Sequence, residues 1–286
     1  MSDAVVFAGG GVAGIAWELG VVAGLMESSK ELASLIRDPQ TRYIGTSAGS
    51  AVATQLAGGL DVDALYAAQL SSETAEFDPK VDVAKLWESL SALDEPGLTQ
   101  EERLQNVGAF ALAAATVTEP ERLVSIRARL PHLDWPERSL TITAVDAATG
   151  AFVTFDRNSD VDLLLAVAAS CAVPGVWPPV TIGDRKYVDG GVRTSANADL
   201  AAGSERVLII TPSAADAPEG MLSVSQAELA ALGDAQVAIV SADAASIAAF
   251  GVNPLDPATR PESALAGREL GRREASRAAA LLSPAP

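Results

Sequence analysis

The chain has few of the residues that cross-link small folds or bind metals. Its 286 residues include one cysteine and one histidine. A single cysteine cannot form an internal disulfide, so a disulfide-stabilised fold is excluded and a reducing compartment, the cytoplasm, is favoured. No group of His, Cys or carboxylate residues has the spacing of metal ligands. We therefore expect neither a metal nor a cofactor.

Positive charge is also scarce. Lys and Arg number 20 against 37 Asp and Glu, and the formal net charge is −17 at pH 7. This charge argues against nucleic acid and anionic membranes as electrostatic partners, and it allows at most transient membrane contact. The chain does not open with a basic segment and an apolar stretch, and no run reaches about 18 uninterrupted apolar residues. We expect no signal peptide and no membrane-spanning helix, and nothing in the sequence indicates an oligomeric state.

Apolar residues, by contrast, make up 49% of the chain. That fraction is ample for a substantial core. A chain of this length can hold one large α/β domain or two modest ones. Because no internal repeat or long linker divides it, we expect a single domain over residues 1–286.

Residues 60–135 differ in character from the rest. Asp61 precedes a helical pattern that it can cap, and residues 81–93 and 101–116 are typical of amphipathic or apolar helices. We expect a mainly helical insertion, which could form a lid or an acyl-chain tunnel. Ordinary packing of these helices on a sheet is the favoured alternative for most of the candidate lining residues. These are Trp87, Leu90, Leu93, Leu104, Phe110 and Leu112.

The remaining elements are predicted from apolar periodicity and turn residues. They are a strand pair (139–145 and 151–155), a helix (161–170), a buried strand (207–211) and a closing helix (261–282). Residues 223–250 are alanine-rich and helical in pattern, but residues 237–240 could form a strand that interrupts them. The sequence leaves these two interpretations open.

A glycine-rich loop joins a strand to a helix near the N-terminus. Residues 4–8 are an apolar run of strand length, and residues 9–14 read Gly-Gly-Gly-Val-Ala-Gly before a helical pattern. Backbone N–H groups in such a loop can converge on an anion or an oxyanion. Gly9, Gly11 and Gly14 also match the G-x-G-x-x-G fingerprint of dinucleotide-binding folds. That fingerprint needs an acidic residue after the second strand, where this chain has a serine turn instead.

The serine turn is the second feature. Residues 42–44, Arg-Tyr-Ile, are strand-like, and residues 45–49 read Gly-Thr-Ser-Ala-Gly. This is the G-x-S-x-G pattern of a nucleophile elbow, in which a serine, here Ser47, sits on a sharp turn between a strand and a helix. Flanking glycines allow the backbones to approach closely. The helix that begins at Ala48 points its N-terminus toward any negative charge that develops beside the serine.

An aspartate follows another short strand. Residues 187–191 read Tyr-Val-Asp-Gly-Gly, which places Asp189 at the strand end. Alone, an Asp-Gly-Gly triplet is more often a turn than a catalytic group. Upstream, residues 169–180 pass from a helix into a proline-punctuated extended segment, which we interpret as a rigid wall beside the site. Cys171 lies in this apolar stretch and is expected to be a core thiol.

In content and order, the glycine loop, the serine turn, the Ala-Ser-x-x-x-Pro passage at 169–174 and the Asp-Gly-Gly triplet resemble the patatin-like phospholipase family. The resemblance implies an α/β fold, a three-layer sandwich with a mostly parallel central sheet. It also implies a serine hydrolase of lipids or other acyl esters, with Ser47 as nucleophile and Asp189 as base. The backbone N–H groups of Gly10, Gly11 and Ala48 would form the oxyanion hole. The other motif glycines are Gly9, Gly14, Gly45, Gly49, Gly190 and Gly191.

The single histidine bears on this dyad. In an α/β-hydrolase triad the histidine comes last in the chain, whereas His132 precedes Asp189. A Ser47–His132 pair assisted by Asp134 or Asp94 is a minor alternative, because triads occur in several chain orders. A surface loop position beside a proline is the favoured interpretation of His132.

Ala13 is a departure from the family pattern. The family usually has Lys or Arg between the third and last glycines of the first motif, where this chain has Ala13. Backbone donors are unaffected, but recognition of a phosphate head group is in doubt, so the substrate could be a neutral ester. A small-ester carboxylesterase, a nucleotide-binding protein and a catalytically silent lipid-binding scaffold are the alternative functions.

Overall fold

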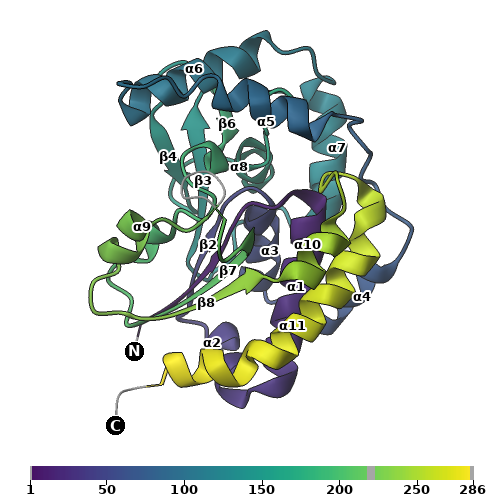
Figure 1. Cartoon of the computed structure of the whole chain (residues 1–286), viewed down its shortest axis with the longest axis vertical. Coiled ribbons are helices and arrows are strands. Elements are labelled where there is room, and N and C mark those ends of the chain that lie inside the picture. Colours follow the sequence, from purple (N-terminus) through teal and green to yellow (C-terminus); the bar gives the residue numbers. More distant parts are fainter. Residues whose placement is uncertain (1, 218–222, 284–286) are drawn as a thin grey trace.

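The computed structural model describes residues 2–217 and 223–283, so residue 1, residues 218–222 and residues 284–286 of the predicted domain lie outside the described residues. The described residues form one sheet of eight strands with helices around it (Figure 1). The strands are β1 (Asp3–Phe7), β2 (Arg42–Gly45), β3 (Leu140–Asp146), β4 (Phe152–Phe155), β5 (Val180–Ile182), β6 (Arg185–Asp189), β7 (Arg206–Ala214) and β8 (Gln236–Ala242).

The centre of the sheet is parallel, as predicted. Strands β3, β2, β1, β7 and β8 lie side by side and run in the same direction. Beyond β3 the sheet is mixed. Strands β4 and β6 each pair antiparallel with β3, and β5 pairs antiparallel with β6. The order β5-β6-β3-β2-β1-β7-β8 puts β3 between β2, which leads to Ser47, and β6, which ends in Asp189.

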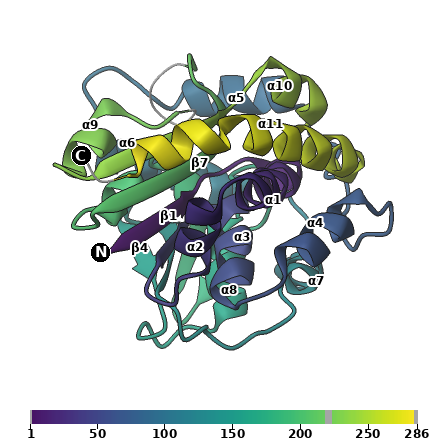
Figure 2. The same cartoon turned by 90° about the horizontal axis from the view of Figure 1, so that it is seen from below.

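Helices cover both faces of the sheet (Figure 2). Val5 and Phe7 of β1 face the larger core, to which α1, α3, α8 and α11 contribute. Ala4 and Val6 alternate to the other face, under η2 and α9. The helices outside the insertion are α1 (Gly11–Ser28), α2 (Lys30–Arg37), α3 (Ala48–Ala57), α8 (Leu163–Ser170), α9 (Gln226–Ala231), α10 (Ala244–Phe250) and α11 (Arg260–Leu281), with 3-10 turns η1 (Gly190–Val192), η2 (Ala198–Ala201) and η3 (Pro257–Thr259).

The segment 60–135 is mainly helical among the described residues. It contains α4 (Val62–Leu70), α5 (Val83–Ser91), α6 (Gln100–Ala113) and α7 (Glu119–Arg129). The Asp61 side chain accepts a hydrogen bond from the Ala64 N–H and caps α4, as predicted. A Cβ on Gly108 of α6 would overlap the Ala147 carbonyl of the β3–β4 turn, so α6 packs closely on the sheet.

Most of the predicted lining residues pack rather than line a tunnel. Leu90 and Leu104 are buried in a cluster with strand residues Val145 and Val188. Leu93 and Phe110 are partly buried against the same cluster. Trp87 and Leu112 are exposed, at 38% and 47% of their surface. Packing on the sheet therefore explains four of these six side chains.

Helix α1 lies in the core against α11. Gly20 and Gly24 of α1 face Gly267 and Gly271 of α11, and a Cβ on any of the four would overlap the backbone of the other helix. By length and composition α1 could span a membrane, but 78% of it is buried inside the molecule. Its apolar residues serve contacts with the sheet on one side and with α11 on another.

Two helices are additional to those predicted, and the structure decides one interpretation that the sequence left open. Helix α7 is rich in charged residues, which apolar periodicity does not register, whereas α2 has Leu32, Leu35 and Ile36 at helical spacing and was predictable from them. Over 223–250 the strand interpretation is correct, because β8 separates α9 from α10 and pairs in parallel with β7. Gly233 lies at φ 61° in the turn before β8, a conformation that ends the helix.

Candidate active site

Ser47 lies on a strained turn between β2 and α3. Its φ of 54° and ψ of −120° are values that residues with a Cβ rarely adopt. A Cβ on Gly45 would lie 2.5 Å from the Ser50 Cα, and one on Gly49 would overlap the Phe7 carbonyl oxygen. Close packing therefore requires both flanking glycines. The turn has the geometry of a nucleophile elbow.

Asp189 ends β6 and contacts the serine. The Ser47 hydroxyl lies close enough to the Asp189 carboxylate to lower its pKa, and the Gly191 N–H donates to Asp189 Oδ1 at 2.8 Å. Asp189 is only 4% exposed. Burial raises the pKa of Asp189 to about 7, although the contacts with Ser47 and Gly191 lower it. A carboxylate with this pKa is a competent proton acceptor near neutral pH.

The glycine loop lies against the serine. A Cβ on Gly9 would be 3.4 Å from the Ser47 Cβ, and the Gly9 N–H is held by the Ser195 carbonyl at 2.8 Å. Within residues 2–217 and 223–283, the backbone N–H groups of Gly10, Gly11 and Ala48 donate to no protein acceptor. Among the described residues, these three amides are therefore not occupied by a protein acceptor.

The predicted wall makes direct polar contacts with both site residues. The Ser47 N–H donates to Ser170 Oγ at 2.9 Å, and the Cys171 thiol donates to the Ser47 carbonyl at 3.2 Å. The Asp189 N–H donates to the Ala172 carbonyl at 3.1 Å. Burial raises the pKa of the Cys171 thiol, so the sulfur stays protonated and donates. The wall therefore fixes the nucleophile turn and the base strand at once.

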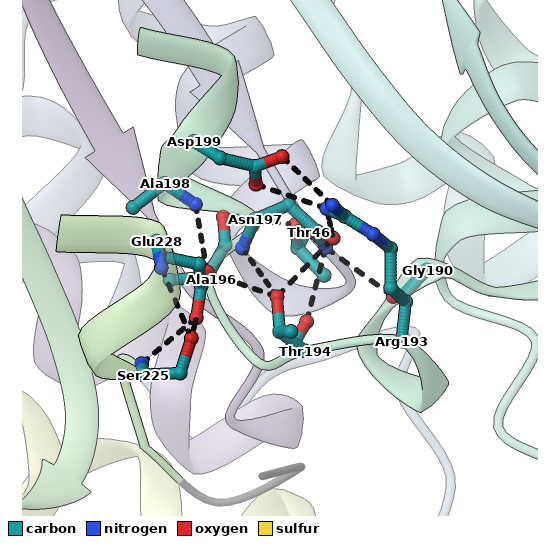
Figure 3. A network of polar contacts seen from close by, with 10 residues as sticks. All are labelled: Thr46, Gly190, Arg193, Thr194, Ala196, Asn197, Ala198, Asp199, Ser225 and Glu228. Atoms are coloured by element: carbon teal, nitrogen blue, oxygen red, sulfur yellow. Dashed lines mark hydrogen bonds and ion pairs between the residues drawn. The ribbon is translucent and has the colours of Figure 1, made fainter. Parts of the chain in front are cut away.

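Two groups of residues at the site escaped the sequence analysis. The Asn197 side chain contacts Thr46 and Gly190, which adjoin the serine and the aspartate (Figure 3). Arg129 of α7 donates from Nη1 to Cys171 Sγ at 3.5 Å and forms an ion pair with Glu76. Their positions along the chain are distant from the motifs, and an isolated Asn or Arg carries no sequence signal.

A cavity of about 430 Å³ lies beside this ion pair. Val12, Gln55, Glu76, Arg129 and Arg260 are among its lining residues, whereas the dyad candidates are not. Its volume lies between α1, α3, α4 and the end of α7, away from the serine hydroxyl. The arginine donors that line it are already bonded to Glu76, to Gln69 and to backbone carbonyls.

Two further predictions concern His132 and metal ligands. His132 is exposed in the segment between α7 and β3, and the titratable group whose pKa the Ser47 hydroxyl affects is Asp189. In the described part of the chain, no group of three or more His, Cys, Asp or Glu residues is arranged to hold a metal ion.

Comparison with known proteins gives a family and remote similarities to solved structures, among them the two below. The model of the family described as Patatin-like phospholipase matches residues 5–202. The type III effector protein ExoU is 17% identical, with 97% of this chain and 53% of that chain covered, at a TM-score of 0.42. VipD from Legionella pneumophila is 11% identical, with 96% and 66% covered, at a TM-score of 0.45. The chain thus spans between about half and two thirds of these solved structures, and no curated protein matches it.

Proposed function

The chain belongs to the patatin-like phospholipase family, and from that premise we propose that it hydrolyses lipid or other acyl esters through a Ser47–Asp189 dyad. The observation that carries the proposal is the position of the Ser47 hydroxyl beside the buried Asp189 carboxylate, whose pKa burial raises to about 7. At neutral pH this carboxylate is part ionised, so it can accept the serine proton without a histidine.

In the first half-reaction the Ser47 Oγ attacks the ester carbonyl carbon while its proton passes to Asp189. The carbonyl oxygen becomes an oxyanion, which the N–H groups of Gly10, Gly11 and Ala48 stabilise. Loss of one such donor in other enzymes raises the barrier by about 2.7–4 kcal/mol. The C–O bond to the alcohol then breaks, and Asp189 returns its proton to the leaving oxygen. The product is an acyl-Ser47 ester and a free alcohol.

The second half-reaction reverses these roles with water. Asp189 accepts a proton from the attacking water, and a second oxyanion forms at the same backbone amides. Collapse of this intermediate breaks the acyl–Oγ bond, returns the proton to Ser47 and releases a carboxylic acid. Each proton that Asp189 takes in a step is given back within that step, so the dyad is regenerated.

The substrate class is proposed more broadly than the family description. Ala13 replaces the basic residue that the resemblance leads one to expect in the glycine loop. A neutral ester is therefore the expected substrate, and a phospholipid with its phosphate head group the less favoured one. A carboxylesterase acting on small esters would use the same dyad, and a series of acyl chain lengths separates it from a lipase.

The test is hydrolysis of a medium-chain p-nitrophenyl ester by the wild type and three variants, each checked for folding by circular dichroism. Ser47→Ala and Asp189→Asn are expected to lower kcat by about 10³-fold or more. His132→Ala, an exposed control, should retain it. Full activity in Ser47→Ala would disprove the nucleophile assignment. Loss of activity in His132→Ala with retention in Asp189→Asn would assign the base to the histidine.

A further inference from the structure

Asn197 is a buried residue in an unusual backbone conformation near the dyad. Its φ of 50° and ψ of 41° lie in the left-handed region, and its side chain is fully buried. Among residues with a Cβ, Asn adopts this conformation most readily. Its side chain does not cap the 3-10 turn η2 that follows, so helix capping does not explain why a buried Asn occupies this left-handed position.

The amide group of Asn197 contacts both arms of the site. Its Nδ2 donates to Thr46 Oγ1 at 3.0 Å and to the Gly190 carbonyl at 3.3 Å (Figure 3). It also donates to the Thr194 carbonyl at 3.0 Å. Thr46 directly precedes the serine, and Gly190 directly follows the aspartate. One amide nitrogen therefore joins the turn that carries Ser47 to the turn that carries Asp189.

The sheet itself does not make this connection. Strand β3 lies between β2 and β6, so no ladder hydrogen bond joins the strands that carry the two side chains. Thr143 of β3 bridges part of the gap, because its hydroxyl contacts Thr46 Oγ1 at 2.8 Å and a Cβ on Gly190 would overlap it. The wall at 169–180 holds both turns from one side, through Ser170, Cys171 and Ala172. The spacing of serine and aspartate therefore depends on the wall and on side chains that cross over β3.

The orientation of the amide is fixed from outside. Asn197 Oδ1 accepts from Arg193 Nη1 at 2.8 Å and from Thr194 Oγ1 at 3.2 Å. Arg193 has donors only, and the Gly190 and Thr194 carbonyls are acceptors only, so the oxygen faces Arg193 and the NH₂ group faces the site. Asp199 pairs with Arg193, and Glu228 of α9 accepts from Thr194 Oγ1 at 2.9 Å (Figure 3). A flipped amide would place its NH₂ group against the Arg193 donor and its oxygen against the Gly190 and Thr194 carbonyls.

We propose that Asn197 is a positioning residue, which holds the Ser47 turn and the Asp189 turn at hydrogen-bond distance through its Nδ2. It touches neither substrate nor the reacting atoms. The proposal rests on the proposed dyad, and it adds a requirement that the motifs do not contain. A misplacement of about 1 Å at reacting groups can lower a rate by about 10²-fold, so loss of this link should be visible in kcat.

The primary variant is Asn197→Gly, because glycine adopts the same backbone conformation without a side chain. The second is Asn197→Asp, which keeps the shape and the acceptor but replaces the Nδ2 donor. Ser225→Ala is the matched control. Its hydroxyl contacts Glu228 at 2.8 Å on the far side of the same network, so the variant weakens the network without touching the amide.

Three measurements are made on each folded protein: kcat and KM on a p-nitrophenyl ester, the rate at which an organophosphonate probe labels Ser47, and the pKa of Asp189 by ¹³C NMR. For Asn197→Gly we expect kcat and labelling to fall about 10- to 100-fold, with KM within about twofold. The Asp189 pKa should fall from about 7 toward its ordinary value as the loosened turn admits water. Ser225→Ala should match the wild type in all three.

Asn197→Asp should lower kcat and labelling as Asn197→Gly does. Unchanged kcat and an unchanged Asp189 pKa in a folded Asn197→Gly would overturn the proposal, as would a rise in KM alone. An equal loss of kcat in Ser225→Ala would overturn it too, because general loosening would then suffice. If the wild type neither hydrolyses esters nor labels at Ser47, the proposed function fails, and the Asp189 titration still decides the role of Asn197.

Discussion

Two polar clusters contact the Ser47 turn, and they are built from opposite chemistry. The amide cluster (Thr46, Gly190, Thr194 and Asn197) meets the turn through neutral donors and acceptors. The arginine cluster (Glu76, Arg122 and Arg129) meets it through Cys171 and consists of charges. The amide cluster belongs to loops at the ends of the core strands. The arginine cluster belongs wholly to the helical segment 60–135.

This difference in charge determines which cluster can lie close to Asp189. Neutral hydrogen bonds fix the geometry around Asp189 without adding a charge that would shift its pKa. The arginine cluster is separated from Asp189 by Cys171 and instead closes the helical segment onto the wall. Burial would raise the pKa of Glu76, but the Arg129 charge and hydrogen bonds, with Arg122 and Arg260, hold it below its ordinary value.

The charge balance of the arginine cluster is uneven. Side chains of Glu76, Arg122 and Arg129 are 8%, 5% and 8% exposed, and one carboxylate serves two guanidinium groups. Burial lowers the pKa of Arg122 to about 10, with the Arg129 charge adding to this and Glu76 opposing it. Arg122 also lies over the Trp177 ring, 3.8 Å from its centroid, which offsets part of the lost hydration. Glu76 is thus the residue on which this cluster depends.

Removal of that carboxylate is the change with the largest expected effect on stability. Glu76→Gln leaves two buried guanidinium groups without a counter-charge, so we expect a loss of about 3–5 kcal/mol in the free energy of unfolding. Urea unfolding at pH 7 measures it. Because the pKa of Glu76 is depressed in the folded state, the difference from wild type should shrink as pH falls below about 4.5.

Glu73→Gln is the control for this change, since Glu73 is exposed in the same segment. It should unfold at the wild-type midpoint. The two clusters have separate roles if Glu76→Gln lowers stability far more than kcat while Asn197→Gly lowers kcat far more than stability. A loss below about 1 kcal/mol in Glu76→Gln would mean that water reaches the arginine cluster.

The next largest effect concerns Asp189 and runs in opposite directions for rate and stability. The folded pKa of about 7 exceeds the ordinary value of 3.8, so the native state binds more protons between these values and stability falls as pH rises through them. Ester hydrolysis should rise over pH 5–7 and level off above. Asp189→Asn removes the buried charge and should gain up to about 4 kcal/mol at pH 8 relative to wild type.

Stability of Asp189→Asn is measured by urea unfolding at pH 5 and pH 8. The gain should be confined to the higher pH, because at pH 5 the wild-type carboxyl is already neutral. A variant that is less stable than wild type at both pH values would show that Asp189 is well hydrated. The absence of charge in the amide cluster would then not explain the raised pKa of Asp189.

The strands of the core were predictable because each is marked by apolar residues that are adjacent in the sequence. Buried parallel strands read as continuous apolar runs, as in β1 and β7. Helix α7 was not predicted, since its sequence EPERLVSIRAR is dominated by charged side chains. Two of those side chains, Arg122 and Arg129, are buried only because Glu76 meets them from another segment. Hydrophobic periodicity has no access to a buried ion pair formed between distant residues.

The residues of the candidate site also differ in how far the sequence predicts them. Ser47 and Asp189 stand in short motifs whose glycines have a local steric reason, and the structure places the Ser47 hydroxyl near enough to Asp189 to lower its pKa. Asn197 is 151 residues beyond Thr46, and its sequence neighbourhood, Thr-Ser-Ala-Asn, is typical of any loop. Contacts of this kind arise only when the sheet order is known, because β3 must first separate β2 from β6.

The smallest expected effect tests whether the two clusters act independently. Cys171 links the arginine cluster to Ser47, and a thiol is a weak donor and a weak acceptor. Cys171→Ser should therefore keep kcat within about twofold, and Cys171→Ala should lose about 1 kcal/mol of stability with a similarly small change in kcat. Steady-state kinetics and urea unfolding measure both. If Cys171→Ala instead loses activity as strongly as Asn197→Gly, the arginine cluster also positions the nucleophile, and the helical segment 60–135 would be coupled to the serine rather than merely packed beside it.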